Sequence, residues 1–123
     1  MIRILAAALL TLALASCANL STLTSTTVTQ QQVVVVANAF DAIEATATQY
    51  ALLPRCGPGV SAICSSVSIL KAIKPAILAG RKDRNALEAW VAGGPQPVNL
   101  VALYSGLTAA VTTLKTLVPK SGA

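Results

Sequence analysis

Apolar residues recur every three or four positions in the stretch after residue 32, which is the spacing of one face of a helix. Pro54 and the Gly57-Pro58-Gly59 run predict where that helix ends. Val33–Val36 is a succession of four β-branched residues and could instead begin a strand. The predicted apolar face consists of Val33, Val36, Phe40, Ile43, Ala47 and Tyr50.

A second helical region is predicted to begin near Ser61. Pro75 interrupts it, because proline lacks an amide donor and crowds the preceding turn. We expect either a kink near Lys74 or a new helix with Pro75 in its first turn. The apolar side of this region consists of Ile63, Val67, Leu70 and Ile77, with Ile69 and Ile73 beside them.

A further weak point in the helical pattern comes at Gly80 and the charged run 81–84. Asp83 could cap a short helix that reaches Val91. The Gly93-Gly94-Pro95 run predicts the end of that helix.

The last segment, from Val98 to Val118, repeats the helical spacing and predicts an amphipathic helix. A transmembrane helix is the alternative, but interspersed polar residues dilute the segment and Lys115 shortens it. A coiled coil is disfavoured because the repeat is short and lacks flanking charges. The chain is therefore predicted to be an all-α protein with a small bundle of three or four antiparallel helices. The apolar positions of this last segment are Leu100, Tyr104, Leu107, Val111, Leu114 and Val118.

The first residues have the pattern of a secretory signal. Met1-Ile2-Arg3 gives a positive start, and Ile4–Leu14 is an apolar run broken by Thr11. The run is shorter than the about 20 residues of a transmembrane helix. It ends in Leu14-Ala15-Ser16-Cys17, which resembles the lipobox of bacterial lipoproteins. An ordinary signal peptide, or a terminal helix with an unrelated cysteine, is the alternative.

The resemblance implies that Cys17 is acylated and becomes the first residue after cleavage. Residues 1–16 would then be the signal peptide, residues 17–32 a lipidated Ser/Thr-rich tether, and residues 33–123 the helical domain. Ala18 follows the cysteine instead of aspartate, which by the same resemblance favours the periplasmic face of the outer membrane. Several acyl chains make such an attachment durable, because one chain alone holds a protein only marginally.

The composition changes the range of partners to expect. Hydrophobic residues make up 54% and mean hydropathy is +0.70, yet aromatic residues are only 3%. The net charge of +5 is mild and is not concentrated with aromatic residues, so a nucleic-acid partner is not expected. A weak attraction to anionic membranes remains open.

Cys56 and Cys64 flank the glycine-rich run and are predicted to form a disulfide, because export would place them in an oxidising compartment. Two free or buried thiols are the alternative. With no histidine among the 123 residues, neither a zinc site nor a nucleophile activated by histidine is expected.

Few other residues are candidates for chemistry. Asp41 and Glu44, one turn apart, could act as an acid and base pair or hold a cation, although a solvated face is the preferred interpretation. Ser68 and Lys71 match the S-x-x-K spacing of penicillin-recognising enzymes, but the accompanying motifs are missing and we treat the match as chance.

Two further groups of side chains have a functional and a structural interpretation. The cations Arg81, Lys82 and Arg84 could contact phospholipid, lipopolysaccharide or peptidoglycan, or could form a solvated turn. The large rings could line a ligand groove, but core positions are the preferred interpretation. These rings are Tyr50, Trp90 and Tyr104.

These observations predict a non-enzymatic envelope lipoprotein with a structural, accessory or partner-binding role and no cofactor. Its partners would be the membrane, through the lipid anchor, and an envelope protein or polymer. The alternatives are a small membrane-active or pore-forming protein, and a carrier of an apolar ligand.

Overall fold

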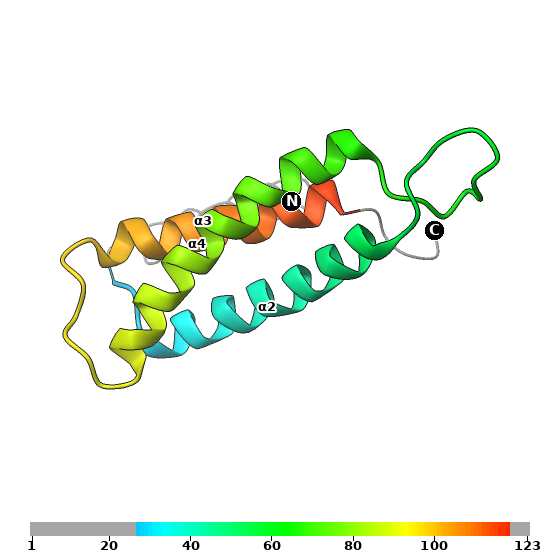
Figure 1. The fold of residues 1–123 in the computed structure, drawn as a ribbon. Coiled ribbons are helices and arrows are strands. Elements are labelled where there is room, and N and C mark those ends of the chain that lie inside the picture. Colours follow the sequence, from blue (N-terminus) through cyan, green and yellow to red (C-terminus); the bar gives the residue numbers. More distant parts are fainter. Residues whose placement is uncertain (1–26, 119–123) are drawn as a thin grey trace, which may run out of the picture.

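The structure is a computed structural model that describes residues 27–118, which fold into three helices (Figure 1). They are α2 (Gln30–Leu52), α3 (Val67–Val91) and α4 (Leu100–Leu117). Successive helices run in opposite directions, and each packs against the other two. The prediction of an all-α bundle of antiparallel helices is confirmed, with three helices in the described range.

Helix α2 begins at Gln30, three residues before the apolar pattern does. Thr29 caps it: its hydroxyl accepts from the Gln32 amide at 3.2 Å, and its own amide donates to Gln32 Oε1 at 2.9 Å. This reciprocal capping box satisfies two amides that the first turn leaves unpaired. The four consecutive valines are therefore helical, not a strand, and the end of the Ser/Thr-rich segment takes part in the bundle.

Helix α3 differs most from the sequence-based expectation. It begins at Val67, not near Ser61, and continues without a break through Pro75 and Gly80 to Val91. Pro75 is exposed, so the carbonyl that loses its amide partner is near water. The buried residues of α3 are spaced by seven and lie on one face of the helix. Their packing against the other helices outweighs the local preference of Pro75 and Gly80 to interrupt it. These residues are Ile73, Gly80 and Leu87.

Helix α4 begins at Leu100, two residues later than predicted, with Asn99 at its N-cap position. The preceding connection turns at Gly93, whose φ of +100° is a conformation that favours glycine. Val98 lies fully exposed in this connection. The helix ends as predicted, and Val118 is buried just after it.

The core is formed by small aliphatic side chains around one phenylalanine. The predicted faces of α2 and α4 are mostly confirmed, but Ile63 and Val67 are 71% and 54% exposed and do not join the core. Both precede or open α3, where the chain has not yet entered the three-helix packing. The largest fully buried apolar side chains are Phe40, Leu87, Leu107, Leu114 and Val33.

Two glycines allow the helices to approach closely. A Cβ on Gly80 would overlap the ring of Phe40 and lie 2.6 Å from its Cζ atom. A Cβ on Gly106 of α4 would overlap the carboxylate of Asp83 on α3. Gly80 therefore sets the contact of α2 with α3, and Gly106 sets the contact of α3 with α4.

We expect the substitution Gly80→Ala to lower the free energy of unfolding by about 1–3 kcal/mol, because the methyl group overpacks the Phe40 site. The helix-propensity gain of about 1 kcal/mol acts in the opposite direction and does not relieve the overlap. Urea unfolding followed by circular dichroism measures the difference.

Gly57→Ala is the matched control, since nothing lies within 4 Å of a Cβ added there. Its stability should equal or exceed that of the wild type. A Gly80→Ala protein as stable as Gly57→Ala would contradict the packing described.

Candidate functional site

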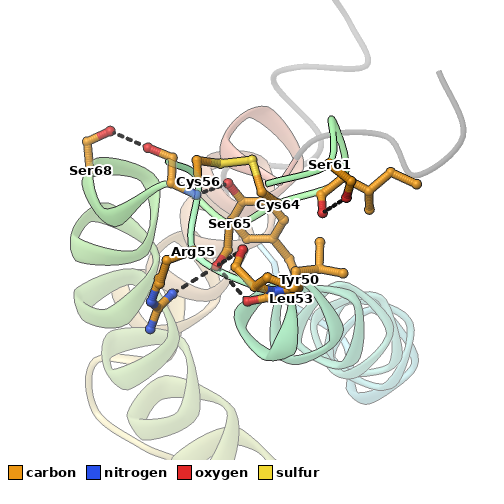
Figure 2. The surroundings of a disulfide bond; sticks show 11 residues. Tyr50, Leu53, Arg55, Cys56, Ser61, Cys64, Ser65 and Ser68 are labelled. Carbon is orange, nitrogen blue, oxygen red and sulfur yellow. Dashed lines mark hydrogen bonds between the residues drawn. A yellow bond between two sulfur atoms is a disulfide. The ribbon is translucent and has the colours of Figure 1, made fainter. Parts of the chain in front are cut away.

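The connection of α2 with α3 is closed by the predicted disulfide between Cys56 and Cys64 (Figure 2). Its two sides also pair through their backbones. The Cys56 amide donates to the Ser65 carbonyl at 3.1 Å, and the Ser65 amide donates to the Pro54 carbonyl at 2.8 Å. This parallel bridge between Arg55 and Ser65 holds the loop at its base.

Ser65 is a wholly buried polar residue at the base of this loop. Its hydroxyl donates to the Leu53 carbonyl at 3.0 Å and accepts from Arg55 Nη1 at 2.9 Å (Figure 2). Beside it, the Ser66 amide donates to the Tyr50 hydroxyl at 2.7 Å. Each of these buried polar groups has a partner, so the loop is a constructed part of the fold.

The acidic residues of α2 pair with arginines of α3. Asp41 contacts Arg84, and Glu44 contacts Arg81. The hydrogen bond from Arg84 to Asp41 raises the pKa of the guanidinium above its ordinary value. Burial lowers this pKa in part, and the charges of the nearby carboxylates raise it further. Arginine is already charged at neutral pH, so this rise keeps the pair ionised and adds no switch.

These pairs correct two interpretations of the sequence. Asp41 is exposed as expected, but neither Asp41 nor Glu44 is a free charge, because each is bound by a different arginine. The run 81–84 is not a turn, because it lies within α3, where only Lys82 of its three cations is outside the described ion pairs. The sequence did not reveal the pairing, since the partners are about 40 residues apart.

The other candidate residues have structural surroundings. Ser68 Oγ lies 2.8 Å from Ser66 Oγ, and Lys71 is exposed, which supports a chance S-x-x-K match. Among residues 27–118, no group of three or more potential metal ligands lies together. The three large rings pack in or against the core, as preferred; they are Tyr50, Trp90 and Tyr104.

An open hollow of about 720 Å³ lies at the other end of the bundle, where the chain enters it. Its walls mix polar and apolar residues from the start of the described chain, the connection of α3 with α4 and the first turns of α4. A carrier of an apolar ligand needs an enclosed, mostly apolar pocket. This hollow is open and its lining is mixed, so it differs from such a pocket in shape and lining. The residues that mark the hollow include Val28, Gln96, Pro97 and Ser105.

The side of α3 away from the core carries lysines and exposed apolar residues, which we term the outer face of α3. Its members fall at steps of four, three, four and four, so they form one stripe along the helix. Sequence reasoning missed this stripe because it assigned Val67 to the core and expected the helix to break. The outer face consists of Val67, Lys71, Lys74, Leu78 and Lys82, all exposed.

Cys17 lies outside the described residues, so its acylation stays a prediction. No family model, curated protein or solved structure matches this chain.

Reduction of the disulfide should lower the free energy of unfolding by about 2.5 kcal/mol, the chain-entropy value for a cross-link across eight positions. Urea midpoints with and without reductant measure this loss. The double variant Cys56→Ser/Cys64→Ser is the control, because its midpoint should not respond to reductant. Equal midpoints for the oxidised and reduced wild type would contradict the stabilising role.

The pair of Asp41 with Arg84 should show a coupling of about 0.5–1 kcal/mol in a double-mutant cycle with Asp41→Asn and Arg84→Gln. High salt should reduce it, because the pair is partly exposed. Glu88→Gln with Arg84→Gln is the matched cycle with a longer separation of 3.9 Å and a smaller expected coupling. Strictly additive effects at Asp41 and Arg84 would count against the pair.

Proposed function

We propose that this chain is an envelope lipoprotein, anchored through acylated Cys17, whose helical bundle has a structural or accessory role. The Leu14-Ala15-Ser16-Cys17 run is the observation that carries the proposal. It follows an apolar run too short to span a bilayer and resembles the lipobox at each of its four positions.

The disulfide supports export. Disulfides persist in oxidising compartments such as the periplasm and are rare in the reducing cytosol. The geometry of the loop fits a lasting bond, since Ser65, Arg55 and the paired backbones hold its two sides together. A bond of this kind is more consistent with a structural crosslink than with a transient redox pair.

The place where the described range begins is also compatible with an anchor. Among residues 27–118, the first buried core residue is Val28, near the start of the described range. Ten positions separate Cys17 from Thr27, a length of at most about 35 Å when fully extended. An acylated Cys17 would thus hold the bundle close to the membrane.

A non-enzymatic role is inferred from how the polar candidates are used. The carboxylates that could have formed an acid and base pair are bound by arginines, and the sequence contains no histidine. The buried hydroxyls of Tyr50 and Ser65 bond the backbone of the disulfide loop. Such side chains stabilise the fold, which suits a protein that presents a surface to an envelope protein or polymer.

A membrane-active protein is the second candidate, favoured by α4. Among the described helices, α4 is the one whose length and composition would allow it to cross a membrane, with a mean hydropathy of 1.3. The same property is expected of a core helix, and Leu107 and Leu114 are fully buried against α2 and α3. Insertion would require these contacts to separate, so the envelope role is preferred.

The intact mass of the protein purified from membranes tests the proposal. We expect a chain that lacks residues 1–16, carries the mass of a diacylglyceryl group with or without a further acyl chain, and is two hydrogens lighter for the disulfide. Cys17→Ser should abolish the acyl mass and leave the chain unprocessed.

Cys64→Ser is the matched control, since it removes another cysteine and should keep the acyl mass. An unacylated, unprocessed product in the cytosol would overturn the proposal. Leakage from liposomes caused by the polypeptide 18–123 would favour the membrane-active candidate instead.

A further inference from the structure

The outer face of α3 points directly away from the bundle. Lys71 and Gly80 are nine residues apart, which is two and a half turns and therefore opposite sides of the helix. Gly80 is buried against Phe40, and Lys71 is exposed. The continuity of α3 keeps Lys74 and Lys82 on the same side as Lys71.

This face has positive charge without compensation. The ion pairs of the described chain use Arg81 and Arg84, and none includes a lysine of the outer face. The acidic residues are directed elsewhere: two on α2 pair with the arginines, Asp83 lies against Gly106, and Glu88 lies near Arg84. The chain contains four acidic residues in total, so all of them lie off this face.

The same face exposes two large apolar side chains, one before its lysines and one between Lys74 and Lys82. Val67 is 54% exposed and Leu78 is 55% exposed. An exposed apolar side chain is not stabilised by contact with water or with a purely ionic partner. The mixture of lysine with valine and leucine therefore indicates a partner with negative charge at its surface and an apolar interior.

We propose that the outer face of α3 binds the surface of a bilayer that contains anionic lipid. The lysine ammonium groups would lie at the lipid phosphates, while Val67 and Leu78 enter between the headgroups. Helix α3 would then lie parallel to the membrane, along about 37 Å of its surface for 25 residues.

A bilayer fits these observations better than a soluble polyanion does. Nucleic acids and acidic polymers provide the charge, but nothing on the helix pairs with bases, and the exposed valine and leucine would remain in water. In a bilayer the lipid phosphates complement the lysines, and the apolar region beneath them complements the valine and leucine. The lysine stems extend toward the phosphates.

In the cell, the strength of this membrane binding rests on the proposed lipid anchor. Three lysines and two apolar residues make a weak contact, and an anchored bundle raises the local concentration so that a weak contact suffices. The intrinsic preference for anionic lipid is a property of the bundle alone. It can be measured without the anchor, so the two proposals can fail separately.

The test uses the polypeptide 18–123, which contains the disulfide and every core residue of the described range. Its fold is checked by helical circular dichroism and cooperative unfolding. Binding is measured by cosedimentation with vesicles of phosphatidylcholine alone or with one-third phosphatidylglycerol. We expect binding to the anionic vesicles that weakens with salt, and much weaker binding to the neutral ones.

The triple variant Lys71→Gln/Lys74→Gln/Lys82→Gln should bind the anionic vesicles about 100-fold more weakly, at about five-fold per lysine. The triple Lys→Arg variant at these positions keeps the charge and should retain binding. Leu78→Gln should weaken binding as well, which a purely ionic contact would not show.

Lys74→Gln and Lys115→Gln form a matched pair with the same loss of charge. Lys115 lies nine residues from Gly106, so it is on the flank of α4 opposite the contact with α3. Lys74→Gln should weaken binding about five-fold and Lys115→Gln should have little effect.

Equal effects of Lys74→Gln and Lys115→Gln, or a triple variant that binds as the wild type does, would overturn the proposal. Equal binding to both kinds of vesicle would also overturn it. Tight binding to a soluble polyanion such as heparin with no preference for anionic vesicles would assign the face to a polymer instead.

Discussion

The packing of the Phe40 ring against the backbone of α3 at Gly80 is the contact on which the rest of the bundle depends. The core otherwise consists mainly of alanine, valine and leucine, and small side chains give a stable interior only when helices lie close together. Gly80 has no side chain and therefore allows this close approach at Phe40, the largest fully buried side chain. Once α2 and α3 meet there, Asp41 and Glu44 come level with Arg84 and Arg81, so the ion pairs follow from the packing.

The two ends of the bundle are closed in different ways. At one end, the disulfide, the buried Ser65 and the Tyr50 hydroxyl fix the connection of α2 with α3. At the other end, Val28 lies near the start of the described range, beside an open hollow and the connection that contains Val98. Within the connection 53–66, Leu53 is the hydrophobic residue that packs against the core, so the disulfide and the buried polar contacts hold the rest of it, whereas Val28 and Leu100 are buried at the opposite end.

The sequence predicted what repeats locally and missed what depends on distant residues. The helical periodicity of α2 and α4 and the core positions of the rings followed from spacing and composition, and the cysteine pair followed from the expected export. The new helix expected at Pro75 was wrong, because the burial of Ile73, Gly80 and Leu87 against two other helices outweighs one lost hydrogen bond. The start of α3 was placed too early, since nothing local indicates that 53–66 folds back upon itself. The arginine partners of Asp41 and Glu44 could not be predicted, because only the helix register brings them together.

The unbroken register of α3 also connects the core with the surface. Residues at 73, 80 and 87 face inward because they are seven apart, and the same periodicity places the lysines and Leu78 together on the opposite side. A helix broken at Pro75 would have rotated Lys71 away from Leu78 and Lys82 and divided the stripe. Proline at an exposed position removes one backbone hydrogen bond without changing that register. The force that keeps α3 continuous is therefore the burial of its inner face, and the cationic, partly apolar outer face is the surface that this burial leaves for a membrane.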